Sequence, residues 1–226
     1  MSGFTEPRPE VVSPSPGGRD DPLGESVVER GNPWLRVFAP RDLRLVIGRH
    51  QDPARELVLA HAQADGVPIY RRIAGGGAVV LTPGMVVVAV RLRRDHVGTT
   101  SYLERVNRAL AGPIQAVCGV APAAAGLGDL AIAQPDGSLR KVLGASLRQS
   151  GPMALYLGCL LVRDEHARME RYLRMPSREP AYRAARSHRD FCDHLDRLGA
   201  QVGALRDAVA AALSAELRAH ALDADA

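Results

Sequence analysis

Lysine is almost missing from this chain of 226 residues. Lysine and arginine together number 29, and Lys141 is the only lysine among them. The chain uses arginine wherever a solvated cation suffices. A position that stays lysine is therefore a candidate for work that needs a compact point charge on a thin stem, not a broad planar fork. The alternative is that one lysine survived by chance in an arginine-biased composition.

Aromatic residues and blocks of like charge are also scarce. Aromatics make up 4% of the sequence, and the formal net charge of +4 comes from arginines that are spread along the chain. A platform for single-stranded nucleic acid needs stacked aromatics, and a duplex-binding surface needs clustered basic residues. The composition therefore predicts no nucleic-acid partner.

The chain lacks the sequence marks of secretion and of a bilayer span. Cys118, Cys159 and Cys192 show no CxxC spacing and cannot all pair, which is typical of reduced thiols. Residues 1–21 contain no apolar signal-peptide core, and no run reaches the roughly 18 apolar residues of a transmembrane helix. We predict a cytoplasmic protein that does not enter the membrane.

The length and the hydrophobic content of 46% fit one folded domain with a proper core. Residues 1–25 are rich in proline, glycine, serine and charge, so we expect a disordered N-terminal tail. Residues 26–226 are expected to form the single domain.

Hydrophobic periodicity predicts short strands interleaved with a few helices. Strands are expected near residues 34–37, 43–47, 67–71 and 153–162, with hairpins joining 78–81 to 85–92 and 129–132 to 140–148. Helices are expected from Asp52-Pro53, from a Ser101–Glu104 capping box, and over 168–173, 187–198 and 203–222. Crossover helices are too few for a doubly wound sheet, so the pattern favours an α+β fold with a mainly antiparallel or mixed sheet packed by helices.

Three consecutive glycines follow Arg71 and Arg72 and lie between two predicted strands. Such a run allows a close approach of the backbone, and N–H groups without neighbouring side chains can point at an anion. The arginines would add charge at that place. A glycine-rich hairpin with two solvated arginines is the alternative. The segment is not a P-loop, because no Gly-Lys-Ser/Thr follows.

Lys141 lies on the predicted strand that follows the turn at residues 135–137. Two small residues, Gly144 and Ser146, come shortly after it. A ligand can lie close to a strand at such positions.

Together these segments resemble the lipoate–protein ligases and their octanoyltransferase relatives. The resemblance rests on the Arg-Arg-x-x-Gly-Gly-Gly-Ala-Val run at 71–79, the segment 48–53, and the strand from Gly128 that leads to the lysine loop. It covers roughly residues 34–192. It implies the class II biotin synthetase-like catalytic domain for residues 26–226, without the small C-terminal accessory domain of the family. The domain would then work alone or with a separate accessory subunit.

The resemblance implies acyl activation and transfer. Lipoate or octanoate would react with ATP and Mg²⁺ to give an acyl-adenylate, and a lysine of a lipoyl-domain or H-protein-type acceptor would take the acyl group. Lys141 would be the catalytic residue, between the α-phosphate and the acyl carbonyl. Asp129 would hold Mg²⁺ or the incoming amine, and Val79, Leu143 and Leu157 would line an apolar slot. The implied nucleotide- and substrate-binding residues are Arg72, Gly75, Gly76, Gly77, Ala78, Val79, Asp129, Gly144, Ser146 and Arg148.

The sequence also departs from that family. Leu81 and Thr82 stand where ligases usually have a His-Asp pair, and Leu157 replaces a common histidine. Two other functions stay open. One is an ATP-independent octanoyl or lipoyl transferase that carries its intermediate as a thioester, with Cys118 as the candidate nucleophile. The other is a non-catalytic acyl-binding relative. Biotin also stays open as the acid.

Overall fold

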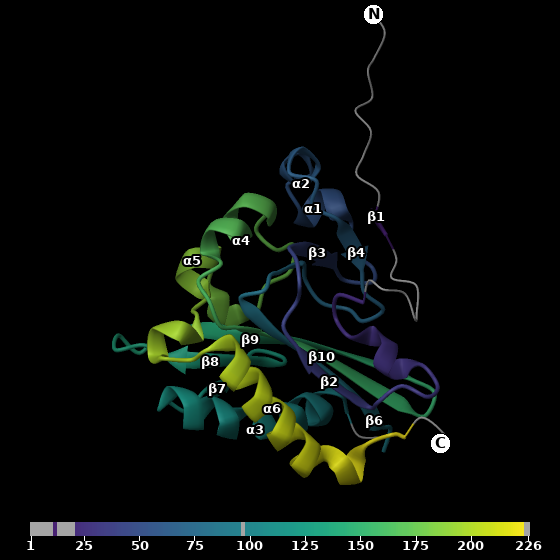
Figure 1. Ribbon diagram of the computed structural model, residues 1–226. Helices are drawn as coiled ribbons and strands as arrows, with labels where there is room; N and C mark the ends of the chain where they lie inside the picture. The colour runs from purple at the N-terminus through teal and green to yellow at the C-terminus, as the bar shows by residue number, and fades with distance from the viewer. Residues whose placement is uncertain (1–10, 13–20, 96–97, 224–226) are drawn as a thin grey trace, which may run out of the picture.

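A six-stranded sheet forms the centre of the structure, a computed structural model that describes residues 11–12, 21–95 and 98–223 (Figure 1). Its strand order is β2-β6-β10-β9-β8-β7, and every neighbouring pair is antiparallel. The strands are β2 (Leu35–Phe38), β6 (Met85–Arg93), β7 (Ala123–Ala125), β8 (Asp129–Ala133), β9 (Leu139–Ser150) and β10 (Met153–Leu161).

A smaller sheet with strand order β1-β4-β3-β5 lies over one face of the large sheet (Figure 1). Here β4 runs parallel to both β1 and β3, whereas β5 is antiparallel to β3. The strands are β1 (Val11–Val12), β3 (Arg44–Ile47), β4 (Ile69–Arg71) and β5 (Val79–Leu81). One antiparallel sheet, one mixed sheet and the helices around them confirm the predicted α+β class.

Helices α3 (Thr99–Cys118) and α6 (Val202–Leu217) cover the other face of the large sheet (Figure 1). The remaining helices are short and lie beside the small sheet or at the edge between the two sheets: α1 (Pro53–Glu56), α2 (Leu59–Ala64), α4 (His166–Tyr172) and α5 (His188–Phe191). Single 3₁₀ turns complete the order: η1 (Glu25–Val28), η2 (Ala181–Arg183), η3 (Leu195–Leu198) and η4 (Arg218–His220). Within the described residues no helix is long and apolar enough to cross a bilayer.

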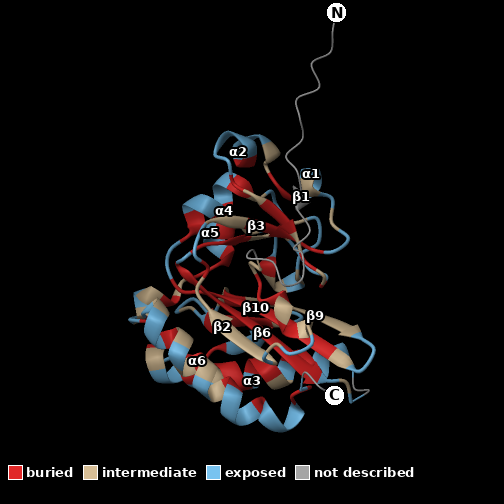
Figure 2. Cartoon of the chain, turned by 45° about the vertical axis from the view of Figure 1, so that its right-hand side comes forward, coloured by how far each residue is buried: buried red, intermediate tan, exposed pale blue. Residues whose placement is uncertain are grey.

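Strand β6 is buried on both faces from Met85 to Leu92, which explains the apolar run over 85–90. Val86, Val88 and Val90 point into the core beneath α3 and α6. Val87 and Ala89 point into the core between the two sheets. The buried residues of both cores meet at this strand, as the red segments in the middle of Figure 2 show.

The predicted disordered tail of residues 1–25 extends too far, because residues 21–25 belong to the described fold. Residues 1–10 and 13–20 lie outside the described part of the chain. In contrast, Leu23 and Glu25 are buried. The Asp21 carboxylate accepts the backbone N–H of Glu25 at 2.6 Å and of Ser26 at 2.9 Å, which starts the turn η1. The described fold therefore includes residues 21–25.

The predicted hairpin between residues 78–81 and 85–92 is wrong. Strand β5 pairs with β3 in the small sheet, whereas β6 pairs with β2 and β10 in the large one. The turn at Thr82 carries the chain from one sheet to the other. The predicted hairpin of 129–132 with 140–148 is confirmed as β8 and β9, with the turn between them.

Helix ends differ from the predictions in three places. Asp52 does cap a helix, since its carboxylate accepts the N–H of Ala54 at 3.0 Å, but α1 ends already at Glu56. Helix α3 begins at Thr99 after Gly98, so the capping box at Ser101 and Glu104 is wrong, and the helix continues through Pro113. The predicted helix over 187–198 is interrupted between α5 and η3.

Candidate functional site

A cavity of about 400 Å³ lies between β5 of the small sheet and β8 and β9 of the large sheet. The segments that carry α4 and α5 line it as well. A smaller hollow of about 110 Å³ opens beside it. Both spaces are lined by the same eight residues: Gly76, Gly77, Ala78, Val79, Lys141, Gly144, Ala145 and Cys159. The glycine loop and the only lysine thus meet, although they are more than sixty residues apart in the sequence.

Lys141 extends from β9 toward the carboxylate of Asp129 on β8. The Nζ–Oδ1 distance is 2.9 Å, and the lysine side chain is 26% exposed, so a ligand in the cavity can reach the amine. The hydroxyl of Tyr182 donates to the other oxygen of Asp129 at 2.8 Å. Burial, and then Asp129, raise the pKa of Tyr182, so this phenol keeps its proton and its role as donor.

Gly144 gives the lysine its place. A β-carbon at this position would be 2.6 Å from Nζ of Lys141 and 3.7 Å from Oδ1 of Asp129. Only a residue without a side chain lets the amine lie over the strand in this way. Gly144, three residues after Lys141, therefore leaves room for the lysine side chain as well as for a ligand.

The glycine loop is held from behind by Arg72. Its Nε donates to the carbonyl of Gly75 at 2.9 Å and its Nη2 to that of Gly77 at 2.6 Å. Arg72 is 5% exposed, and this burial lowers its pKa to about 10. Gly76 has a φ of 95°, and a β-carbon there would be 2.8 Å from Nη2 of Arg72, so the loop needs glycine at this position.

The carbonyls of Gly75 and Gly77 accept hydrogen bonds from Arg72, whereas the amides of the loop have no protein partner in the described part of the chain. Within the described residues, the backbone N–H groups of Gly75, Gly76 and Gly77 donate to no protein acceptor. Gly76 and Gly77 line both cavities, whereas the predicted binding residue Gly75 lines neither. Successive N–H groups without a protein partner can bind an anion. Arg72 thus supports the glycine loop, and its N–H groups that face the loop already donate to the Gly75 and Gly77 carbonyls.

The other predicted residues divide into two sets. Asp129 lines the larger cavity, and Ser146 and Leu157 line the smaller one. Arg148 lines neither cavity, because its Nη1 donates to the carbonyl of Ile73 at 2.8 Å and so supports the loop. Leu143 does not line the proposed apolar slot either, since it is fully buried in the core beneath α3.

The nucleophile that we considered for a transferase lies elsewhere. Cys118 ends α3, packs into the core on the far side of the large sheet and lines neither cavity. Burial raises the pKa of its thiol, which disfavours the reactive thiolate.

Sequence reasoning missed the cavity residues that come from 159–192. Cys159, Met169, Phe191 and Cys192 give the cavity an apolar wall, and His188 also lines it. Burial, and then Arg183, lower the pKa of His188 to about 4, so its ring is neutral at neutral pH. Cys192 forms a parallel bridge with Lys141, and the N–H of Asp193 donates to the Lys141 carbonyl at 2.8 Å. The local sequence carries no signal of this pairing.

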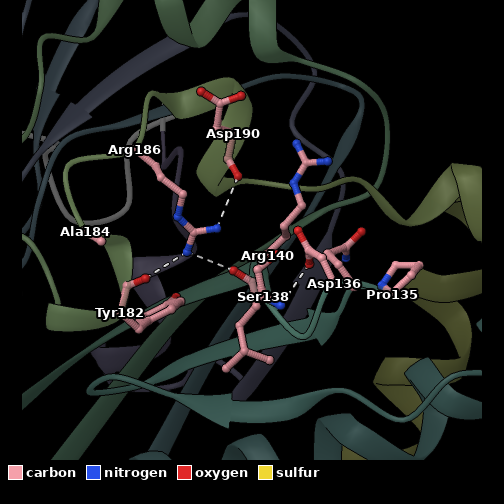
Figure 3. A pocket seen from close by; sticks show the side chains of 10 residues that line it. Pro135, Asp136, Ser138, Arg140, Tyr182, Ala184, Arg186 and Asp190 are labelled. Atoms are coloured by element: carbon pink, nitrogen blue, oxygen red, sulfur yellow. Dashed lines mark hydrogen bonds between the residues drawn. The ribbon is translucent and has the colours of Figure 1, made fainter.

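A wider hollow of about 760 Å³ beside the β8–β9 turn is a less suitable site. Figure 3 shows Arg186 at one side of this hollow, with its guanidinium turned to backbone oxygens. It donates to the carbonyls of Tyr182 at 2.7 Å and Leu139 at 3.0 Å. Since its donors serve the local backbone, this arginine organises the segment 182–190 and leaves little for a ligand.

Comparison with protein families gives one match, which covers most of the chain. Residues 21–217 match the model of the lipoyl protein ligase A/B catalytic domain. The chain belongs to this family. The match begins at Asp21, where the described fold begins after β1, and the family resemblance predicted from the sequence is confirmed.

Solved structures of lipoate–protein ligases share the fold of this family member. A bipartite ligase from Thermoplasma acidophilum, described with its E2 lipoyl domain, has a TM-score of 0.73 at 24% identity, over 87% of this chain and 77% of that one. Lipoate-protein ligase A bound with ATP has a TM-score of 0.71 at 21% identity, over 93% and 85%. A putative lipoate protein ligase from T. acidophilum with bound lipoic acid has a TM-score of 0.68 at 20% identity, over 93% and 85%.

Proposed function

We propose that this family member activates lipoate or octanoate with ATP and transfers the acyl group to a lysine of a lipoyl-domain or H-protein-type acceptor. The observation that carries the proposal is the position of the Lys141 amine, at a cavity that it shares with the free amides of the glycine loop. One of the similar structures contains ATP, another contains lipoic acid, and a third is described with a lipoyl domain. These ligands support the choice of substrates and acceptor class.

The first half-reaction brings two anions into contact. A carboxylate oxygen attacks the α-phosphorus of ATP, and the bond to the β-phosphate breaks, so that pyrophosphate leaves and acyl-AMP remains. Fixed positive charge and N–H donors offset the repulsion between the anions. In the proposal, Lys141 supplies the charge and the amides of Gly75, Gly76 and Gly77 supply the donors.

The second half-reaction is attack on the acyl carbonyl. The amine of the acceptor lysine forms the amide bond, the bond to AMP breaks, and the amine gives up a proton. The Lys141 amine would stabilise the negative charge that develops on the carbonyl oxygen and on the departing phosphate. Asp129, which holds Lys141 at 2.9 Å, would keep the amine in this position through both steps.

The acyl chain needs an apolar space. Val79 and Leu157 line the smaller hollow, and Leu161, Met169 and Phe191 line the larger one. Each CH₂ group of an octanoate-length chain that leaves water stabilises the bound state by roughly 0.8 kcal/mol. We therefore place the acid with its carboxylate near Lys141 and its chain along these residues.

A dedicated magnesium site at Asp129 does not fit this geometry. Magnesium prefers octahedral oxygen ligands and keeps several of its waters. One oxygen of Asp129 faces Lys141 at 2.9 Å and the other accepts from Tyr182 at 2.8 Å. Our prediction of Asp129 as a metal ligand therefore gains no support, and the proposal gives no step to a protein-bound magnesium ion.

A cysteine-dependent transferase is less well supported. Cys159 and Cys192 line the cavity, whereas Cys118 does not. Burial raises the pKa of Cys159 to about 12 and also raises the pKa of Cys192, so both are thiols at neutral pH. A nucleophilic cysteine needs a lowered pKa or an adjacent base.

The test is an assay of the purified full chain with ATP, octanoate or lipoate, and an isolated lipoyl domain. We expect release of AMP and an added acyl mass on the acceptor, and no transfer without ATP. Lys141→Ala should lower transfer by about 10²-fold, as for a lost charge in a preorganised site. Lys141→Arg should not restore it, because the guanidinium is broader than the space beside Gly144.

Arg206→Ala, whose side chain lies on α6 and lines neither cavity, is the matched control and should keep full transfer. Transfer without ATP from an octanoyl carrier protein, with an acyl mass on Cys159 or Cys192, would replace the proposal with the transferase. Tight binding of octanoate with neither reaction would favour the non-catalytic relative. The proposal places the reaction in the cytoplasm, where ATP is available and the three free cysteines stay reduced. A separate accessory subunit is compatible with it.

A further inference from the structure

Asp164, His166 and His194 form a cluster that the proposed reaction does not use. Asp164 lies in the connection from β10 to α4, His166 is the first residue of α4, and His194 lies just before η3. One donor atom of each residue lies within 4.8 Å of the other two. We propose that these three side chains bind a divalent transition-metal ion of the zinc type.

The two segments are already fixed to each other. The N–H of Asp196 donates to the carbonyl of Val162 at 2.8 Å, and the rings of His166 and His194 meet edge to face at 5.7 Å between centroids. His166 is buried, whereas His194 is partly exposed and Asp164 is exposed. The binding framework is therefore rigid on one side and open to solvent on the other, which gives an ion a path of entry.

The donor distances are close to those of a metal site. Ligands of a tetrahedral Zn²⁺ lie about 2.0–2.2 Å from the ion and hence roughly 3.3 Å from one another. Oδ1 of Asp164 is 2.7 Å from Nδ1 of His166, and Oδ2 is 4.0 Å from Nε2 of His194. These two distances lie on either side of the tetrahedral spacing. The carboxylate of Asp164 is exposed, and its Oδ1 also accepts the backbone N–H of His166 at 3.0 Å, which keeps it beside the ring.

The contacts of His166 call for a cation at Nδ1. Its Nε2 is 3.1 Å from the carbonyl of Cys192, a contact that requires Nε2–H as the donor. A neutral ring with that hydrogen turns the lone pair of Nδ1 toward the carboxylate of Asp164. The opposite tautomer sets the lone pair of Nε2 against the carbonyl. A metal ion on Nδ1 satisfies both contacts at once, and so does a second proton.

His194 shows the same arrangement. Its Nδ1 is hydrogen-bonded to Oδ1 of Asp196, which leaves Nε2 turned toward Asp164. A metal-binding histidine characteristically gives its other ring N–H to a carboxylate or a backbone carbonyl, which fixes the tautomer and the ring orientation. Here Asp196 serves His194 and the Cys192 carbonyl serves His166. Both histidines thus have the outer hydrogen-bond partner that is typical of metal ligands. Two histidines in solvent would not need such partners.

The donor set selects the ion. Two imidazole nitrogens and one carboxylate suit zinc, cobalt or nickel, whereas magnesium and calcium prefer oxygen ligands throughout. The site also has a structural consequence. His166 holds the carbonyl of Cys192, and Cys192 pairs with Lys141, so a bound ion would stiffen the strand-like segment beside the lysine.

The experiment uses the full chain without an affinity tag, stripped with a chelator and dialysed. Titration with Zn²⁺ should give about one equivalent bound, and Co²⁺ should give the visible bands of a four- or five-coordinate nitrogen–oxygen site without the strong near-ultraviolet band of thiolate ligation. The melting temperature should rise by about 5–10 °C once the ion is at a hundred times its Kd, and an excess of Mg²⁺ should change neither result.

Variants separate the proposed ligands from other donors. Asp164→Asn and His194→Gln should each weaken Zn²⁺ binding by about 100-fold or more. Asp196→Asn, which removes only an outer partner, should weaken it by roughly 10-fold. His220→Gln, at an exposed histidine of η4, should bind like the parent chain. Circular dichroism of each variant checks that it is folded.

Three results would overturn the site. One is binding below about 0.2 equivalents at ion concentrations well above those of ordinary zinc sites. A second is equal binding by His194→Gln and His220→Gln. The third is a thiolate band with Co²⁺, which would move the ion to Cys159 and Cys192.

Discussion

Gly144 lies beneath the Lys141 amine, and replacing it with alanine is the smallest change that tests the site. The new methyl group would be 2.6 Å from Nζ, so the lysine must move off the strand. Since Nζ is the far end of a flexible side chain, the fold should lose less than about 1 kcal/mol. We expect Gly144→Ala to lower turnover by about 10-fold or more in the AMP-release assay.

The control for this variant is Gly203→Ala. Gly203 is exposed in α6 with nothing within 4 Å of its added β-carbon. Alanine is the better helix former there, so stability should rise by about 0.5–1 kcal/mol and turnover should not change. Equal turnover of both variants would show that the position of the amine over Gly144 is irrelevant.

Glu25 makes the stability of the fold depend on pH. Burial raises its pKa to about 7, although its carboxylate accepts the N–H of Ile73 at 2.8 Å and Arg72 attracts it. A raised folded-state pKa means that the stabilisation is complete below the unfolded pKa of about 4.5 and is lost as the pH rises through about 7. The full difference is about 3 kcal/mol.

Glu25→Gln should remove this dependence. The amide oxygen still accepts from Ile73, and the side chain is neutral at every pH. Urea unfolding at about pH 4, below the unfolded pKa, should give nearly equal free energies for parent and variant, and at about pH 8 the variant should be the more stable by up to about 3 kcal/mol. Glu216→Gln, exposed on α6, should follow the parent at both pH values. If the free energy of unfolding changes with pH in the same way for Glu25→Gln as for the parent, Glu25 is not the source of the pH dependence.

At the scale of elements, the connection from β5 to β6 depends on one buried hydroxyl. Oγ1 of Thr82 donates to Oε1 of Glu165 at 2.7 Å and accepts the N–H of Gly84 at 3.1 Å. Thr82→Val keeps the shape but leaves both partners unsatisfied. We expect a loss of about 1–3 kcal/mol in urea unfolding.

Thr100→Val, on the exposed first turn of α3, is the comparison and should stay within about 0.5 kcal/mol of the parent. If Thr82→Val unfolds at the same urea concentration as Thr100→Val, the turn is held by packing alone.

The elements that the sequence predicts well are those whose pattern is local. The apolar run of β6 shows that the strand is buried on both faces, and the turn chemistry at 135–137 predicts the β8–β9 hairpin. The β5–β6 error has the same origin. A turn signal shows that the chain reverses, but it does not show whether the two strands share a sheet. That choice depends on the strands with which each one pairs: β5 pairs with β3, and β6 pairs with β2 and β10.

The candidate site divides in the same way. Lys141 and the glycines carry a composition signal and a motif, and the structure brings them to one cavity. The wall from Phe191 and Cys192 has no such signal, because the helical pattern of 187–198 hides an extended break. That break exists because Cys192 and Asp193 pair with the backbone of Lys141. Pairing between distant segments gives no periodicity in either of them.

At the scale of the whole molecule, both cores share the strands of the large sheet. The core under α3 contains Leu110 and the core between the sheets contains Leu45, and both side chains are fully buried. Strands β6 and β10 contribute residues to each core. Loss of either core exposes one face of the same strands, so neither layer can unfold without weakening the other.

We therefore expect Leu45→Ala and Leu110→Ala to lower one common transition. Each should cost about 2–5 kcal/mol, or roughly 5–15 °C in melting temperature for a chain of this size, and the double variant should show nearly the sum of the two losses. Val120→Ala, at an exposed position after α3, should change little.

Calorimetry decides the question. A calorimetric enthalpy equal to the van't Hoff enthalpy supports one cooperative unit. A separate low-temperature transition in Leu45→Ala alone would show that the small sheet folds as a unit of its own. The cavity would then open without unfolding of the large sheet, because the glycine loop and Lys141 would belong to different units.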